Sequence, residues 1–471
     1  MKKQKLLTAM LMMALCLPMA TSCGDDDSEP KKQDNEQPGN DKPDVTPVNK
    51  VLTTTEQKEY LEDVGLELNG KFKADEFRHY SDLAQYIDDT YGDYDWDDVE
   101  EWAEDIWDEL RGKAIGTHQE TETEDWGGWT STYVYNYTDY KAVLMASNFT
   151  GRWEARNGRW NRKDASDLSF VFKNESGQEC VLRLTTSGTV TKVHLYDSDD
   201  WVDYSYESTD NGSVSNEYYD RTNCTIGVPQ HITITLTEGG KTLVESKTDI
   251  DLSNIKNEEF DLSQSAVTAK TTVTLSNGYT IKGENIAYSK TSVTANATLI
   301  KGSETLVKAS FSCNLSNIPS EILTAYYDMD DDDLDDSFRN SNGNVTAFSV
   351  DVLGKVQVKG SINDLRQLAD DFEAADDDEE NESKFKQDVA NINSHINANI
   401  YYNGGTTKQA SFLFIPFEDR WDNYSEWYCE PGLKFPDGST YTFENFFTED
   451  DFKDLIDAFE RLEDDFEALD N

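Results

Sequence analysis

Tryptophan and arginine residues form the pattern in this sequence that is most suggestive of ligand binding. Trp126 and Trp129 flank two glycines, and Asn157-Gly158, a pair typical of a two-residue hairpin turn, separates two further tryptophans. Exposed tryptophans stack on the apolar faces of sugars, and neighbouring arginines hydrogen-bond hydroxyl or acidic groups. The pattern predicts a glycan-binding surface made of Trp126, Trp129, Trp153, Trp160, Arg152 and Arg159.

A structural role explains the same residues. Trp153 and Trp160 are placed to pack across the hairpin and against amphipathic helices, while the arginines balance nearby acids. Large aromatic side chains are more often buried than exposed in folded proteins. This second interpretation is therefore favoured for the hairpin pair.

A run of aspartates in the segment YYDMDDDDLDDSF offers the oxygen ligands that calcium prefers. The run lacks the turn glycine and the closing glutamate of an EF-hand loop, so a solvated acidic loop is the favoured alternative. The candidate ligands are Asp328, Asp330, Asp332 and Asp335. The sequence predicts no cofactor other than this calcium ion.

Catalytic motifs are absent from the sequence. It holds no GxSxG, HExxH, P-loop or GxGxxG pattern in the right context, and its five histidines do not cluster. Two carboxylates could still form a glycosidase pair, but one of them would need an apolar pocket that raises its pKa. Nothing in the sequence marks such a pair, and we expect a protein without enzymatic activity.

Four cysteines remain outside the N-terminal segment, and all are widely spaced: Cys180, Cys224, Cys313 and Cys429. They lie in no CxxC or cysteine–histidine cluster, which argues against zinc. Outside the cytoplasm they could form two disulfides, in any of three pairings. Cys313 alternates with Phe311 and Leu315, as a buried strand residue would. Core thiols without disulfides are slightly favoured.

The N-terminus has the parts of a secretory leader. Lys2, Lys3 and Lys5 form a positive segment, and residues 6–20 form an apolar stretch that is too short to span a bilayer. Three small residues then precede Cys23, as a signal peptidase requires. The pattern predicts a cleaved leader that ends directly before this cysteine.

The stretch ATSCGDDD resembles the lipobox of Bacteroidetes lipoproteins, in which the cysteine is diacylated and becomes the mature N-terminus. The segment that begins EQKEYLEDVG is also similar to lipoproteins of that group that have no known activity. The resemblance implies lipidation of Cys23 and an export signal at Asp25, Asp26 and Asp27. It implies a protein anchored in the outer-membrane bilayer and facing the cell exterior; the periplasmic face is the alternative.

Composition indicates the general class of the whole chain. Its 471 residues include 93 acidic and 42 basic ones, which gives a formal charge of −51. Such a surface repels nucleic acid, so we expect no nucleic-acid partner. Apolar residues make up 37% of the chain, which is enough for a folded core, and the chain length suggests two or three domains.

Helical and strand patterns divide the chain into segments. Apolar spacing of three and four predicts helices over 55–68, 81–91 and 99–110, and from Thr448 to the end, while period-two alternation begins at Trp126. The predicted segments are 1–22 (leader), 23–50 (disordered acidic tether), 51–125 (helices), 126–260 (first hairpin repeat), 261–344 (second repeat), 345–417 (third repeat with a helical insertion over 364–395) and 418–471 (hairpin and helix).

An internal repeat supports this division. TLVESKTDIDLSNI at 242–255 aligns with TLVKASFSCNLSNI at 305–318, and the alignment also pairs Gly239 with Gly302. Each copy has the pattern of a strand, a glycine turn and a second strand, which predicts a β-hairpin. Weaker copies pair 267–283 with 345–360, and 295–311 with 397–412.

These patterns predict an α+β fold. We expect mainly antiparallel strands, as repeated hairpins in one or two curved sheets, with amphipathic helices at both ends and the helical insertion packed on a sheet face. The predicted function is non-catalytic binding of a glycan or a surface protein. The alternatives are a carrier of an apolar ligand between sheet and helices, and a carboxylate-dependent glycoside hydrolase.

Overall fold

A computed structural model describes residues 47–252, 267–289, 292–314, 343–421 and 424–469. The predicted leader, the lipidation site Cys23, the aspartates behind it and the predicted calcium ligands Asp328 to Asp335 lie outside these residues. The fold is α+β and mainly antiparallel, with strands in consecutive hairpins and helices near both ends and in one insertion, which confirms the predicted class. Over the described ranges, no helix is long and apolar enough to cross a membrane.

Two compact units make up the chain. The first consists of the described residues through Tyr86, of Val244–Thr248 and of the described part of 262–471. The second consists of Ile87–Leu243 and the described residues of 249–261. The boundary thus falls within helix α3 (Arg78–Tyr91) and within strand β8 (Lys241–Asp251).

The first unit is a meander in which each strand pairs with the next in antiparallel fashion. Tight connections at one end of these strands contain glycines with positive φ, such as Gly278, Gly302 and Gly354. The strands are β9 (Val267–Leu275), β10 (Tyr279–Ser289), β11 (Ser292–Lys301), β12 (Glu304–Asn314), β13 (Asn344–Val352), β14 (Val356–Ile362), β15 (Ile396–Tyr402), β16 (Ala410–Trp421), β17 (Tyr424–Lys434) and β18 (Thr440–Thr442).

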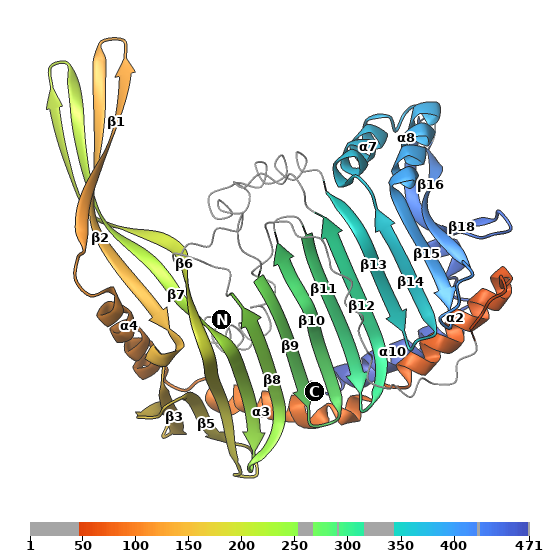
Figure 1. Ribbon diagram of the computed structural model, residues 1–471, viewed down its shortest axis with the longest axis horizontal. Helices are drawn as coiled ribbons and strands as arrows, with labels where there is room; N and C mark the ends of the chain where they lie inside the picture. Colours follow the sequence, from red (N-terminus) through yellow and green to blue (C-terminus); the bar gives the residue numbers. More distant parts are fainter. Residues whose placement is uncertain (1–46, 253–266, 290–291, 315–342, 422–423, 470–471) are drawn as a thin grey trace. The chain divides into compact units, whose positions relative to one another are not determined.

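Helix α2 (Thr54–Asn69) lies along the turn end of this meander, as Figure 1 shows. It begins with a capping box between Thr53 and Glu56. Its buried Val64 packs on residues beside successive turns, among them Tyr279, Leu306 and Leu353. Helix α10 (Lys453–Glu467) packs against α2, and short α9 (Phe443–Phe446) contacts β17 and β18. Helix α2 therefore covers the turn ends of several hairpins.

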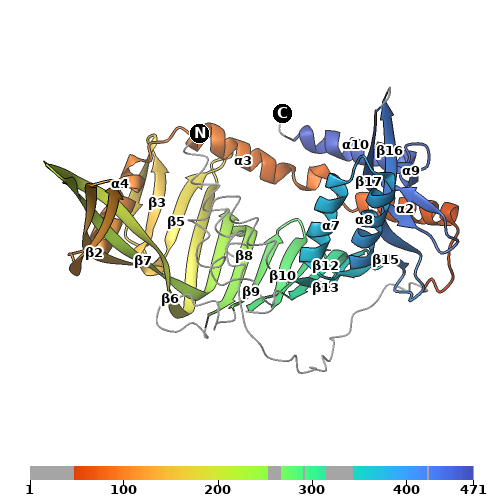
Figure 2. The same ribbon diagram turned by 90° about the horizontal axis from the view of Figure 1, so that it is seen from above.

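The insertion between β14 and β15 consists of two helices, α7 (Leu365–Asp377) and α8 (Glu382–His395), which agrees with the predicted helical span. Buried Phe385, Val389 and Ile392 of α8 pack on Phe414 and Trp427 of β16 and β17. Figure 2 shows both helices beside these strands. The insertion thus packs on a sheet face, as predicted.

The strands of the second unit have a different order, β1–β2–β7–β6–β5–β3–β4. The β2–β7 and β3–β5 pairs are parallel and the rest are antiparallel. The strands are β1 (Gly116–Trp126), β2 (Trp129–Met145), β3 (Gly151–Arg156), β4 (Arg159–Lys163), β5 (Leu168–Lys173), β6 (Glu179–Thr209) and β7 (Gly212–Glu238). Helix α4 (Asp97–Arg111) packs on β2 and β4.

The repeated sequences coincide with hairpins. In the second copy, Gly302 opens the connection from β11 to β12, and the two strands pair in antiparallel fashion. In the first copy Gly239, also at positive φ, lies between the end of β7 and the start of β8. Asn157-Gly158 forms the predicted two-residue turn, with φ of 55° and 79°.

Two boundaries differ from those expected. Strand structure begins at Gly116 rather than at Trp126, because THQETETEDW alternates threonine with acids and has no apolar signal. The last helix begins at Lys453; Thr448 and Asp451 form the expected hydrogen bonds, but within the turn that precedes the helix.

Candidate functional site

Four strands of the second unit present most of their aromatic side chains on one side. Residues directly opposite each other in a sheet point to the same face, so the pairing of Trp126 with Trp129, of Tyr137 with Tyr219 and of Tyr219 with Trp201 defines that face. We call it the aromatic face. Its rings are Trp126, Trp129, Tyr133, Tyr135, Tyr137, Trp201, Tyr204, Tyr206 and Tyr219.

The rings at the tip of β1 and along β6 are the most exposed of the aromatic face. Trp126 is 69% exposed, Trp201 62% and Tyr206 53%. Figure 1 shows the two hairpins, β1–β2 and β6–β7, extending side by side. Monomeric proteins rarely expose so many contiguous large rings without a ligand or partner to cover them.

The inner rings are fixed by contacts with one another. Tyr219 stacks on Tyr137 with ring centroids 5.6 Å apart, and its centroid lies 6.5 Å from that of Tyr135. The Tyr219 hydroxyl also donates to Glu217, and this bond raises the pKa of the phenol to about 12. These rings therefore stay neutral and rigid at physiological pH.

Arg221 anchors the base of the aromatic face. Its guanidinium donates to both carboxylate oxygens of Asp199 at 2.7 Å and lies 4.0 Å from the ring centroid of Tyr137. Its Nη1 also approaches Nε2 of His118 at 3.3 Å. Because an arginine nitrogen can only donate, Nε2 accepts, and Nδ1 of His118 therefore donates to Asp139.

The opposite face of the same four strands is mainly polar, with threonines such as Thr121, Thr123 and Thr132. Helix α4 contacts this side, since Arg111 pairs with Asp220 at 2.7 Å and lies 4.0 Å from the ring centroid of Tyr140. The helix thus supports the sheet from behind. Its contacts leave the aromatic face uncovered.

Trp153 and Trp160, the predicted hairpin pair, lie elsewhere and are only 1% and 3% exposed. Trp153 contacts Trp102 of α4 edge-on at 5.4 Å, and Trp160 packs on Trp96 at 5.1 Å. These two tryptophans adopt the packed alternative and present no ring to solvent. Of the predicted aromatic residues, the structure places Trp126 and Trp129 together on the aromatic face.

The predicted arginines, Arg152 and Arg159, lie on β3 and β4 and not on the strands of the aromatic face. Glu154, which is 8% exposed, accepts hydrogen bonds from Lys163 at 2.7 Å and from Arg152 at 3.1 Å. Lys163, followed by Arg152, holds the pKa of this carboxyl below its usual value. Arg159 lies at the hairpin turn opposite Arg156, with its side chain exposed. Arg152 therefore balances an acid of its own strand.

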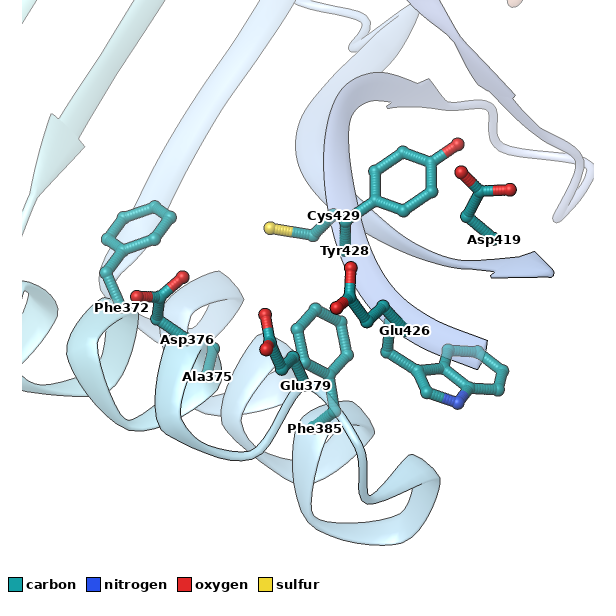
Figure 3. Close-up of a pocket in the computed structure, with 10 residues that line it drawn as sticks. Phe372, Ala375, Asp376, Glu379, Phe385, Asp419, Glu426, Tyr428 and Cys429 are labelled. Carbon is teal, nitrogen blue, oxygen red and sulfur yellow. The ribbon is translucent and has the colours of Figure 1, made fainter. Parts of the chain in front are cut away.

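A pocket of about 370 Å³ lies in the first unit between α7 and β17. Figure 3 shows Phe372 and Asp376 on the helix side and Cys429 and Tyr428 on the strand side. The lining combines apolar and acidic residues: Phe372, Ala375, Phe385, Trp427, Tyr428 and Cys429, with Asp376, Glu379, Asp419 and Glu426. We call this space the acidic pocket.

The position of the acidic pocket follows from the edge of β17. Trp427 donates its backbone N–H to the carbonyl of Glu379 at 2.8 Å, so the α7–α8 connection lies against that edge. The pairing of β17 with β18 begins only at Gly432. Alternate residues of β17 point to opposite faces, and the pocket, lined by both Glu426 and Trp427, wraps around the strand edge.

The cysteines of the described residues form no disulfide. Cys180, Cys224, Cys313 and Cys429 are thiols, which agrees with the favoured alternative. Burial, followed by the charge of Glu238, raises the pKa of Cys180 to about 11. In the part of the chain that the structure describes, no three histidine, cysteine or acidic side chains are placed to hold a metal ion.

The chain matches no model of a known protein family, no curated protein and no solved structure at a significant level.

Proposed function

We propose that this protein is a non-catalytic lipoprotein, anchored through acylated Cys23 and displayed on the outer-membrane surface, which binds a glycan on its aromatic face. The observation that carries the proposal is the set of exposed rings aligned on one side of four strands. Flat rings stack on the apolar faces of sugars, while the carboxylates and phenol hydroxyls between them accept hydrogen bonds from sugar hydroxyls.

Charge narrows the class of glycan. Glu120, Glu122, Glu124 and Glu217 share the aromatic face, whereas Arg221 lies at its base. Anionic polysaccharides would be repelled by this surface. We therefore propose a neutral glycan as the ligand.

A glycan array tests the proposal with the Cys23→Ser chain, which cannot be acylated and is used as a soluble protein. We expect binding to neutral oligosaccharides and none to sulfated or uronic-acid glycans. Binding restricted to anionic glycans, or to no glycan at all, would overturn the proposed ligand. Protease treatment of intact cells tests surface display separately.

The two alternative functions have weaker support. A carrier needs a dry cavity, but the apolar stripes of α2 and α8 are packed on strands, as Val64 and Ile392 show. The groove along α10, lined by Phe447 and Phe459, is open to solvent. A hydrolase needs positioned carboxylates. Within the described ranges, the four acids of the acidic pocket have no hydrogen-bond or ion-pair partner to hold them.

A further inference from the structure

The acidic pocket differs from an ordinary acidic surface because it is a concave space with an apolar lining. Phe385 is 3% exposed, and Ala375 is 4% exposed. The pocket also contains the rings of Phe372, Trp427 and Tyr428. Asp376 and Asp419 are exposed and Glu379 and Glu426 are half-buried, and these acids lie beside aromatic and aliphatic carbon (Figure 3).

The charges in the acidic pocket are uncompensated within the described part of the chain. The nearby carboxylate of Glu426, followed by burial and by Asp376, raises the pKa of Glu379 above its usual value. By contrast, Asp378 just outside the pocket pairs with Lys384 at 2.8 Å. The acids in the pocket therefore repel one another and favour any cation that enters.

The size and the lining of the acidic pocket favour an organic cation over a metal ion. Among the described residues, no three acidic, histidine or cysteine side chains converge on one metal-sized point, and the pocket acids lie around a space of about 370 Å³. A bare metal ion would leave most of this space unfilled and would not contact its apolar lining. An organic cation with an alkyl stem would contact both the acids and the carbon surface.

The chain itself provides an example of such a contact at the wall of the pocket. The ammonium group of Lys386 lies 4.2 Å from the ring centroid of Trp427 and pairs with Glu382 at 2.6 Å. One ring of the pocket thus already contacts an ammonium group that is also bound to a carboxylate. Aromatic rings and carboxylates together recognise ammonium groups in general.

We propose that the acidic pocket binds a primary alkylammonium group, carried either by a free aliphatic amine or by a lysine side chain. The stem lies against Phe372 and Phe385, and the ammonium group lies between Glu379 and Glu426. This site is in a different unit from the aromatic face. The proposal does not rest on glycan binding.

Isothermal titration of the full chain with 1,5-diaminopentane, and separately with a lysine-containing tripeptide, tests the proposal. We expect binding of at least one probe, and the Glu379→Gln/Glu426→Gln variant should weaken it by about tenfold or more, since two charge-assisted contacts are lost. The control is Asp370→Asn, an exposed acid of the neighbouring helix α7 that does not line the pocket. It should bind like the unchanged chain.

The results distinguish the sources of the amine and can contradict the site. Preference for the diamine indicates a free amine, and preference for the tripeptide indicates a protein partner. Equal binding by the double variant and the unchanged chain would overturn the site, because it would show attraction to overall charge alone. Absence of binding by either probe, or magnesium displacing the amine more effectively than sodium does at equal ionic strength, would also overturn it.

Discussion

Tyr219 on β7 stacks on Tyr137 on β2, with their ring planes 27° apart, although the two residues are distant in sequence. The parallel pairing of β2 and β7 places them directly opposite each other. The same register aligns Tyr135 with Glu217, and Tyr219 in turn pairs with Trp201 on β6. The strand register that brings this pair together therefore also aligns the other rings of the aromatic face in rows.

Replacing a buried tryptophan should affect stability rather than binding. Trp153→Ala should lower the free energy of unfolding by about 3–5 kcal/mol, because it removes a ring that is 1% exposed and leaves a cavity beside Trp102. Trp126→Ala, at an exposed ring, should change it by less than about 0.5 kcal/mol. Urea denaturation measures both, and a marginal effect of Trp153→Ala would contradict the packed interpretation.

Alkaline pH should destabilise the first unit through Tyr60 and Tyr402, whose ring centroids lie 4.5 Å apart. Burial raises the pKa of Tyr60 to about 12 and also raises the pKa of Tyr402. Below about pH 10 both states keep the phenols protonated, whereas above it only the unfolded state ionises readily. Stability should therefore fall as the pH rises from about 10 toward 12.

The variant Tyr402→Phe provides the comparison for this prediction. It removes one titrating phenol at the cost of the hydrogen bond to Gln57. We expect a lower melting temperature at neutral pH but a shallower fall in alkali. If the melting temperature of the variant falls as steeply in alkali as that of the unchanged chain, other groups cause the loss of stability.

Cys180 should react slowly with thiol reagents in the folded protein. Its side chain is fully buried, and the raised pKa of about 11 leaves little thiolate at mildly alkaline pH. We expect the reaction rate to increase sharply in denaturant, as followed by mass spectrometry of the labelled peptides. Immediate labelling of Cys180 in the native chain would contradict its burial.

Amine binding to the acidic pocket should weaken at acid pH. The pKa of Glu379 lies above its usual value of 4.5, so this residue takes up a proton early as the pH falls. Its protonation removes one of the charges that attract the ammonium group. Titrations across the acid range should show this loss in the unchanged chain, whereas a Glu379→Gln variant should respond less steeply.

Local sequence patterns were sufficient to predict most of the elements. Glycines at hairpin turns and the repeated strand pattern predicted the meander, and the spacing of Leu365, Leu368 and Phe372 predicted the helical insertion. These signals are short-range. Local patterns do not decide whether Trp153 and Trp160 form a ligand surface or a packed pair. Their exposure depends on the residues that pack against the hairpin, such as Trp96 and Trp102.

The aromatic face could not be predicted in this way. Strict alternation would place Trp201 and Tyr204 on opposite sides, but a bulge between Trp201 and Asp203 brings both to one face. The parallel pairing of β2 with β7 joins strands that are far apart in sequence, and local patterns do not encode it. The alternation of Tyr133, Tyr135 and Tyr137 was the available signal, and it indicated one face of one strand only.

The most direct test of the central claim compares residues on the two faces of the same hairpin. Trp201→Ala/Tyr206→Ala removes two exposed rings from the aromatic face, whereas Tyr218→Ala removes a ring that is 41% exposed on the opposite face. Calorimetric titration with the neutral glycan selected on the array measures both variants. Each stacked ring contributes roughly 1.5 kcal/mol or more of burial, so the double variant should lose more than about a hundredfold in affinity, and Tyr218→Ala should bind normally. Equal affinities for the two variants would contradict the claim that the aromatic face is the binding surface.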